Sequence, residues 1–195
     1  PRANAKLSPR DVDNAAEAIA CADVLVLQLE VPMAASIRAA EIARESSTRV
    51  LLNPAPAAAL PDSFLRLVNV IVPNEIEFEA LTGIAPDSKD AVLQGSRAMS
   101  DRGVDATVVT VGNRGAYLVE CGRVEHYEAQ PVSRVVDTTG AGDAFCGALA
   151  MRIGLGCPLG EAVQFANRAA AIAVTRMGAV PSLPRIDELS EENVS

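Results

Sequence analysis

The segment VVDTTGAGDAF, residues 135–145, combines a strand-like end, a loop with two glycines and the start of a helix. Gly140 and Gly142 allow the backbone to approach a ligand closely, and the unpaired N–H groups of a first helical turn favour an anion there. Asp143, in the same turn, could take a proton from a hydroxyl group aimed at a phosphate. An ordinary helix start that is stabilised by an aspartate would show the same pattern.

A second segment, PNEIEFEALTG at residues 73–83, directly follows an apolar run. If Asn74 begins a helix, Glu77 lies three residues further on and shares its face, so that an amide and a carboxylate project together from the carboxyl end of a strand. Such a pair can hold a water-coordinated Mg²⁺ ion. The alternative is a helix N-cap followed by acidic residues that complement the helix dipole.

Two further segments carry polar residues at the ends of predicted strands. TVGNRG, Thr110–Gly115, places a glycine-bounded turn after a strand. A tight β-turn without a ligand is the alternative interpretation of this segment. Glu30 ends a strand-like run just before Pro32, at the carboxyl end where open α/β sheets bind ligands. A solvated glutamate is the alternative for Glu30.

The elements that must position these residues alternate short apolar runs with Ala-rich segments of helical period. Near-continuous apolar runs predict parallel strands at Asp23–Leu29, Arg49–Pro54 and Val68–Asn74. Helices are predicted at Pro32–Arg44, Pro61–Leu67 and Asp87–Arg102, the last of them ending at Gly103. Three later strands, at residues 106–111, 116–120 and 124–129, are joined by the turns GNRG and CGR, which predicts an antiparallel meander.

Two helices are predicted in the last third of the chain. After Gly140, apolar residues recur every four positions at Phe145, Leu149 and Ile153, and a second apolar stripe comprises Val163, Ala166, Ala170, Ala173 and Val174. We therefore expect a single α/β domain over residues 1–195. Its sheet is predicted to be Rossmann-like and predominantly parallel, with helices on both faces and a short antiparallel edge.

The composition of the chain argues against several classes of function. The net charge of -8 and the pI near 4.7 argue against broad binding to nucleic acid or anionic membranes, because such binding needs a basic surface. The chain shows no apolar run of about 18 residues and no signal-peptide layout, so we expect a cytoplasmic protein. The four cysteines form no CxxC pair and only one histidine is present, which predicts reduced, mostly buried thiols rather than a transition-metal centre.

Taken together and in this order, the segments resemble the ribokinase-like carbohydrate kinases. DTTGAGDAF is similar to that family's C-terminal signature and NEIE to its Asn-x-x-Glu motif. The similarity extends over essentially all of the chain through NAKLS near the start, LQLE ending at Glu30, NPAPA at residues 53–57 and AVTRMGAVPS at residues 173–182. The resemblance implies that ATP phosphorylates a sugar hydroxyl, with conversion of D-ribose to D-ribose 5-phosphate as the expected reaction.

The resemblance also implies roles for individual residues. Asp143 matches the catalytic base, which contacts the sugar hydroxyl and removes its proton. The N–H groups of Gly140, Ala141 and Gly142 match an anion hole. Glu30 matches a residue that contacts the sugar, and Glu77 matches a residue that organises Mg²⁺. Matches to nucleotide-binding residues are Asn74, Thr110, Gly112, Asn113, Arg114, Gly115, Gly142 and Asn167. Matches to the loops that hold a monovalent cation, usually K⁺, are Asp137, Thr139, Ala173, Arg176, Gly178 and Ser182.

Two departures accompany the resemblance. Asn167 lies where this family often carries a histidine near the adenine. The family's first strands, its sugar-covering lid and its NxxGGN-like segment have no counterpart, and the chain contains no GG dipeptide. We therefore expect further residues upstream of Pro1, and the resemblance implies that the full-length protein is a homodimer. Open alternatives are a kinase for 2-keto-3-deoxygluconate, fructose-type sugars or nucleosides, and a non-catalytic nucleotide-binding module, with the 195-residue chain alone expected to be inactive.

Overall fold

The computed structural model describes residues 3–189 of the chain. The chain divides into two compact units. The first unit comprises Pro1–Val111 and Tyr117–Glu125, and the second comprises Gly112–Ala116 and His126–Ser195.

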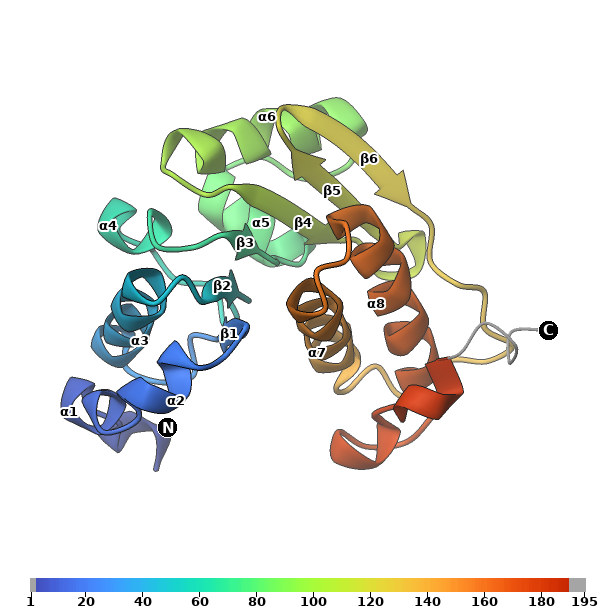
Figure 1. The fold of residues 1–195 in the computed structure, drawn as a ribbon. Helices are drawn as coiled ribbons and strands as arrows, with labels where there is room; N and C mark the ends of the chain where they lie inside the picture. Colours follow the sequence, from blue (N-terminus) through green and yellow to red (C-terminus); the bar gives the residue numbers. More distant parts are fainter. Residues whose placement is uncertain (1–2, 190–195) are drawn as a thin grey trace. The chain divides into compact units, whose positions relative to one another are not determined.

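Six strands form one sheet in the order β1-β2-β3-β4-β5-β6 (Figure 1). The first four are parallel to one another and comprise Val24–Leu27, Arg49–Leu52, Val70–Ile71 and Ala106–Thr110. The 3-10 turn η2 (Gly112–Arg114) leads from β4 to β5 (Ala116–Glu120), and a two-residue turn leads to β6 (Arg123–Tyr127), so that this edge is antiparallel. The predicted parallel sheet with a short antiparallel edge is confirmed, although β3 has only 2 residues.

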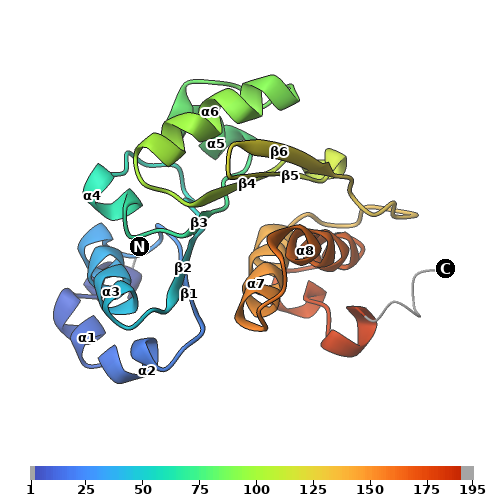
Figure 2. The ribbon, with the colours of Figure 1, turned by 45° about the horizontal axis from the view of Figure 1, so that its top comes forward.

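The helices that connect the parallel strands lie on one face of the sheet (Figure 2). This placement is expected, because connections between parallel strands are right-handed and the strands follow one another in the same direction across the sheet. These helices are α3 (Met33–Glu45), α4 (Asp62–Leu65), α5 (Glu75–Thr82) and α6 (Lys89–Asp101). Helices are thus present in the three predicted regions, and Gly103 follows α6 with a φ of 103°.

Three short elements precede β1 in a region for which the sequence pattern predicted no structure. They are η1 (Asn4–Lys6), α1 (Pro9–Asp13) and α2 (Ala16–Ala20). Ser8 and Asp11 form a capping box at the start of α1, where the Asp11 N–H donates to Ser8 Oγ at 3.3 Å and the Ser8 N–H donates to Asp11 Oδ2 at 2.9 Å. Val12 then packs in a small core against α3.

The core of the first unit is built from the apolar runs of the strands and the facing helices. Leu52, Phe64 and Ile71 are fully buried in a cluster that joins β2, α4 and β3. A second cluster joins α5 to the antiparallel edge through Phe78, Val109 and other residues of the edge strands. These contacts fix the carboxyl ends of β1 to β4, where the predicted polar residues of this unit lie.

Two long helices dominate the second unit, namely α7 (Ala141–Gly154) and α8 (Leu159–Ala173). The predicted stripe of α7 is confirmed, since Phe145, Leu149 and Ile153 are all buried. Small residues such as Ala144, Ala169 and Ala173 line the contact between the helices, which allows their backbones to approach closely. Two 3-10 turns, η3 (Val180–Ser182) and η4 (Ile186–Leu189), follow α8.

The prediction of mostly buried thiols is wrong. Only Cys146 is buried, whereas Cys21 and Cys121 are exposed and Cys157 is intermediate. Cys21 caps the C-terminus of α2 and Cys121 occupies the turn between β5 and β6 with a φ of 50°. Both cysteines lie outside the apolar faces of helices and strands. They are therefore exposed, unlike most free cysteines.

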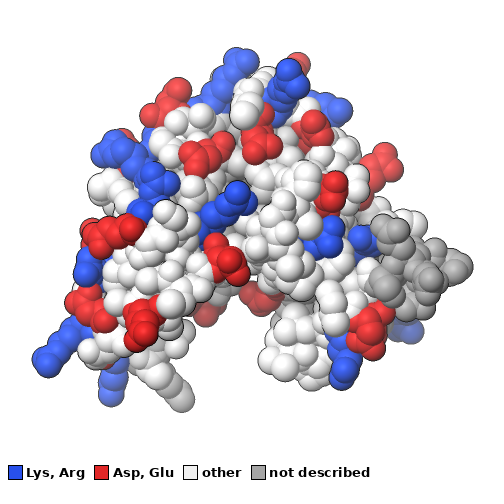
Figure 3. All heavy atoms as spheres, viewed as in Figure 1, with Lys and Arg blue, Asp and Glu red and all other residues white. Residues whose placement is uncertain are grey.

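The surface carries charges of both signs. On the face shown in Figure 3, lysine and arginine side chains (blue) are intermingled with aspartate and glutamate side chains (red). Among residues 3–189, no helix combines the length and the apolar composition that crossing a membrane requires.

Candidate functional site

The first turn of α7 carries the predicted catalytic residue. Asp143 is exposed in this turn, which begins after the N-cap Gly140, and Gly142 is exposed beside it. The N-cap glycine offers no side chain to the helix start, and the Ala141 N–H donates to Thr138 O at 3.2 Å. The turn therefore presents an aspartate beside the N–H group of Gly142 at a helix start, which favours an anion, while the Ala141 N–H is already used by Thr138 O.

The backbone before α7 is held in an unusual conformation. Gly140 has a φ of 80°, and a Cβ atom there would lie 3.2 Å from Ala179 O and 3.3 Å from Ser182 Oγ. Any larger residue would therefore be strained and crowded. Glycine at this position lets the loop before α7 approach the loop of residues 179–182.

Asp137 joins the same two loops. Its Oδ1 accepts the Thr139 N–H at 2.9 Å and its Oδ2 accepts the Gly178 N–H at 2.9 Å. Hydrogen bonds from the side chain and the backbone of Thr139, and from the Gly178 N–H, lower the pKa of Asp137 below its ordinary value. The carboxylate is thus kept ionised at the centre of the predicted cation loops.

The other predicted cation residues lie on these loops or at the end of α8. Ser182 is fully buried, and its Oγ donates to Ala179 O at 2.7 Å and lies 3.4 Å from Thr139 O. Ala173 is buried at the end of α8, and Arg176 forms an ion pair with Glu188 of η4. Carbonyl, hydroxyl and carboxylate oxygens are the ligands that hard cations prefer, so the donor set fits a monovalent cation.

The predicted nucleotide turn and Asn167 both contact the backbone of residues 127–129 in the second unit. Gly112 and Gly115 have φ values of 58° and 93°, and the turn closes with a Gly115 N–H to Gly112 O bond of 3.0 Å. A Cβ atom at Gly115 would overlap Tyr127 O and lie 2.5 Å from the Ala129 nitrogen. Asn167 Nδ2 donates to Tyr127 O at 3.0 Å and to Glu128 O at 3.2 Å.

Asn167 is consequently a structural residue as well as a nucleotide candidate. It is 7% exposed, and its amide nitrogen is directed to the backbone that also contacts Gly115. The sequence pattern gave Tyr127 and Glu128 no role, because their contribution is made by backbone carbonyl groups rather than by side chains.

In the first unit, Asn74 and Glu77 form the start of α5. Asn74 Oδ1 accepts the Glu77 N–H, while Glu77 accepts the Asn74 N–H and a hydrogen of its Nδ2, all at 2.9 Å. Both residues therefore share one face, as predicted, and they also make the capping box that was the alternative. A bridge pairs Asn74 with Thr110, which ends β4.

The Asn74 and Glu77 pair fits Mg²⁺ only as part of a larger ligand set. Glu77 is 5% exposed and both of its carboxylate oxygens accept hydrogen bonds from Asn74. Among the described residues, no three His, Cys, Asp or Glu side chains form a metal centre of their own. Mg²⁺ commonly retains water and takes further oxygens from substrate phosphates, so one or two protein groups are sufficient.

Glu30 is exposed three residues after the end of β1. It lies at the carboxyl side of the parallel strands, as do Asn74 and Thr110 in the same unit. Each unit thus carries its own group of predicted residues, one around these strand ends and the other around the start of α7.

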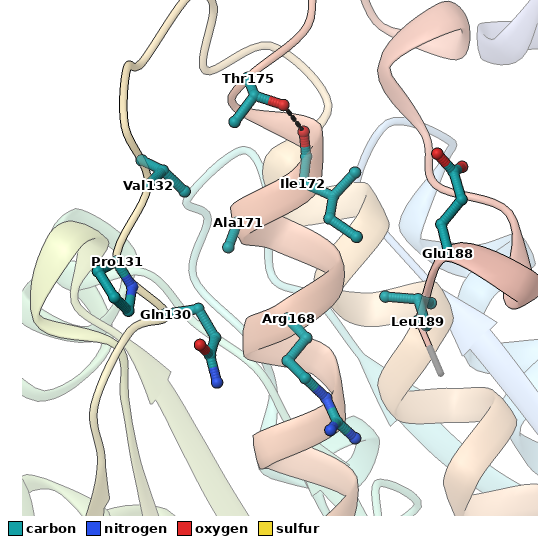
Figure 4. Close-up of a pocket in the computed structure, with 9 residues that line it drawn as sticks. All are labelled: Gln130, Pro131, Val132, Arg168, Ala171, Ile172, Thr175, Glu188 and Leu189. Carbon is teal, nitrogen blue, oxygen red and sulfur yellow. Dashed lines mark hydrogen bonds between the residues drawn. The ribbon is translucent and has the colours of Figure 1, made fainter. Parts of the chain in front are cut away.

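A separate cavity of about 230 Å³ lies beside α8 in the second unit (Figure 4). Segment 130–132 forms one side of it and η4 contributes Glu188 and Leu189, while Arg168, Ala171 and Ile172 come from α8 and Thr175 follows its C-cap. None of these residues was predicted to bind substrate, nucleotide or cation.

A mostly parallel sheet and a helix start that suits an anion are features of α/β proteins that bind nucleotides or phosphate groups. Residues 1–186 match the family described as pfkB family carbohydrate kinase. The chain belongs to this family.

Curated relatives agree with this assignment. A ribokinase from Staphylococcus aureus is 39% identical over 190 residues, which cover 97% of this chain and 62% of the relative. A deoxyribokinase from Salmonella typhi is 38% identical over 190 residues, with the same shares covered. The chain thus spans about three fifths of the length of these relatives.

Solved structures show the same fold. The structure of Arabidopsis thaliana ribokinase complexed with ribose and ATP has a TM-score of 0.87 at 30% identity, over 91% of this chain and 57% of that one. An E. coli protein described as a ribokinase II, in complex with ATP and Mg²⁺, has a TM-score of 0.77 at 26% identity, over 94% of this chain and 62% of that one.

Proposed function

We propose that the full-length protein transfers the γ-phosphoryl group of ATP to a hydroxyl group of D-ribose, giving D-ribose 5-phosphate and ADP. The family match over residues 1–186 supports a carbohydrate kinase, and the ribokinase relatives support ribose as the acceptor. The observation that carries the proposal is the exposed Asp143 in the uncapped first turn of α7.

Asp143 acts as the base in this proposal. As the acceptor oxygen attacks phosphorus, its proton passes to the Asp143 carboxylate, and the bond from phosphorus to the ADP oxygen breaks. The N–H groups of the first turn of α7, Gly142 among them, stabilise the negative charge on the transferring group. Positioning and charge stabilisation are sufficient for this reaction, because it needs no covalent enzyme intermediate.

The two groups of predicted nucleotide residues have different roles in this proposal. Gly112–Gly115 and Asn167 bind the nucleoside part in the second unit, and Asn74, Thr110 and Glu77 orient the phosphates and their Mg²⁺ in the first. When bound, Mg²⁺ neutralises phosphate charge. The E. coli structure with ATP and Mg²⁺ supports this pairing of cofactors.

A monovalent cation, with K⁺ as the expected ion, is proposed for the loops that contain Asp137 and Ser182. The oxygen-rich surroundings and the lowered pKa of Asp137 support it. The cation shapes the loop before α7 without contacting the sugar.

A second candidate acceptor is 2-deoxy-D-ribose. The deoxyribokinase from Salmonella typhi is 38% identical to this chain, nearly as similar as the ribokinase from Staphylococcus aureus at 39%. The two sugars differ by one hydroxyl group, and a site that hydrogen-bonds that group discriminates strongly against the analogue that lacks it.

A substrate panel tests the proposal. Purified full-length protein with Mg·ATP is assayed for ADP release with ribose, 2-deoxyribose, fructose and 2-keto-3-deoxygluconate, once in KCl and once in tetramethylammonium chloride. We expect kcat/KM for ribose to exceed that for either keto sugar by at least about tenfold, and the rate to be higher in KCl. Equal rates on ribose and a keto sugar would refute the ribose assignment, and preference for 2-deoxyribose would establish the second candidate.

A further inference from the structure

Asn53, the residue after β2, links three neighbouring strand ends through its side chain. Its Oδ1 accepts a hydrogen from Gln28 Nε2 at 3.2 Å, just after β1, and its Nδ2 donates to Val72 O at 2.9 Å, just after β3. The side chain is half-buried. An asparagine amide offers a donor and an acceptor at once, and both are used here to connect strands that are far apart in sequence.

The backbone around Asn53 strengthens the link toward Glu30. The Asn53 N–H donates to Leu27 O at 2.9 Å, and the Leu29 N–H donates to Ala55 O at 2.8 Å. The chain after β1 is therefore joined to the chain after β2 at three successive points, residues 27, 28 and 29. Glu30 is the next residue, so its position is set by these bonds.

The other side of Asn53 reaches the segment that carries Asn74. Val72 lies two residues before Asn74, and its N–H donates to Leu52 O at 2.8 Å while its carbonyl oxygen accepts from Asn53. Pro73 O then accepts the Thr110 N–H at 3.0 Å. Asn53 thus stands between the strand end that leads to Glu30 and the strand end that leads to Asn74 and Thr110.

We propose that Asn53 is a positioning residue, which holds the sugar-contacting segment at Glu30 in register with the nucleotide segment at Asn74. The inference rests on the proposed function, because that function gives Glu30 and Asn74 their ligands. Phosphoryl transfer is sensitive to small errors in the placement of its two substrates, and a side chain that joins both segments controls this placement without touching either substrate.

Asn69 provides a matched control within the same sheet. It is also a half-buried asparagine, and its Oδ1 accepts the Val50 N–H at 2.9 Å while its Nδ2 donates to Asp105 Oδ2 at 2.7 Å. It joins strands in the same way as Asn53, but at their amino ends, away from Glu30 and Asn74. Replacing Asn69 therefore costs similar hydrogen bonds and leaves the proposed site intact.

The kinetic test compares Asn53→Ala with Asn69→Ala in the full-length protein. For Asn53→Ala we expect KM for the sugar to rise about tenfold and KM for ATP about threefold. For Asn69→Ala we expect both KM values to stay within about twofold of the parent. Similar kinetic losses in both variants would show that Asn53 contributes only to stability, and unchanged KM values in Asn53→Ala would overturn the proposal.

The variant Asn53→Asp separates the two contacts. Its carboxylate still accepts the hydrogen of Gln28 but presents an oxygen instead of a donor to Val72 O. We expect KM for the sugar to recover to near the parental value while KM for ATP stays as high as in Asn53→Ala. Recovery of both values, or of neither, would contradict separate roles for the two bonds.

Hydrogen exchange followed by mass spectrometry gives a reading that does not depend on kinase activity. We expect Asn53→Ala to accelerate exchange in peptides that cover residues 27–31 and 72–77 at least about fivefold more than Asn69→Ala does, because local opening follows the lost bonds. Equal exchange in the two variants would refute the positioning role. If the parent phosphorylates no sugar, the proposed function fails, whereas this measurement still decides whether Asn53 holds the two segments.

Discussion

Gly140 adopts a backbone conformation that a residue with a side chain would resist. Its φ of 80° is strained for a residue with a side chain, and a Cβ atom there would make tight contacts with Ala179 O and Ser182 Oγ. Gly142, two residues later, differs in both respects, since its φ is not positive and, among the described residues, no heavy atom beyond its own turn lies within 4 Å of the place that a Cβ atom would take. The same glycine type therefore has different structural requirements at the two positions.

The pair Gly140→Ala and Gly142→Ala tests this difference. Gly140→Ala is expected to lower the free energy of unfolding by about 1–2 kcal/mol, because it imposes a left-handed conformation and a crowded contact on alanine. Gly142→Ala is expected to leave it unchanged or to raise it by up to about 1 kcal/mol, because alanine favours a helix more than glycine does. Urea denaturation of both variants measures the two values, and equal losses would show that the conformation of Gly140 is not constrained.

The sequence indicated the chemistry of several residues but not all of their contacts. The spacing of Asn74 and Glu77 predicted that they share a face, and three hydrogen bonds confirm it. The contacts of Asn167 with Tyr127 O and Glu128 O join residues that lie 40 and 39 positions apart. No local pattern shows that the end of β6 runs beside α8, so that contact was not predictable from the sequence.

At the scale of the elements, apolar periodicity predicted the strands and the longer helices because it directly reflects burial. The stripe of Phe145, Leu149 and Ile153 is an example, since all three side chains are buried. The first helix, α1, was missed because it has 5 residues and only Val12 is buried. Its Ser-Pro-x-Asp start was nevertheless a usable signal, since serine caps the helix and proline suits its first position.

The contact between the end of α8 and η4 predicts a pH dependence. Arg176 Nη1 lies 3.3 Å from Glu188 Oε2, and the hydrogen bond with Arg176, together with the Arg185 N–H, lowers the pKa of Glu188 from 4.5 to about 2. Because the folded state favours the carboxylate, its stabilising contribution is complete above pH 4.5 and is lost as the pH falls toward 2.

The variant Glu188→Gln tests this contact. Its midpoint of urea denaturation is expected to lie below the parental midpoint at pH 6, and the difference should shrink as the pH is lowered from about 4.5 toward 2. Asp187→Asn is the control, because Asp187 pairs with the highly exposed Arg185 rather than with Arg176. A difference for Glu188→Gln that persists unchanged at pH 2 would contradict the assignment.

At the scale of the whole molecule, the proposed chemistry is divided between two compact units. The first contributes Glu30, Asn74, Glu77 and Thr110, and the second contributes Asp143 with the glycine turns and the cation loops. The order of strands and helices along the chain was enough to predict the α/β class. The division into units was not predictable, because the boundaries between them fall inside strands β5 and β6.

The central claim is that Asp143 removes the proton from the acceptor hydroxyl group, and Asp143→Asn in the full-length protein tests it most directly. Glu161→Gln is the control, because Glu161 is likewise the acidic residue in the first turn of its helix, α8. We expect kcat of Asp143→Asn to fall at least about hundredfold while the Kd for ATP, measured by calorimetry, stays within about twofold. Glu161→Gln should retain its rate. An Asp143→Asn variant that keeps a tenth of the parental rate would contradict the account.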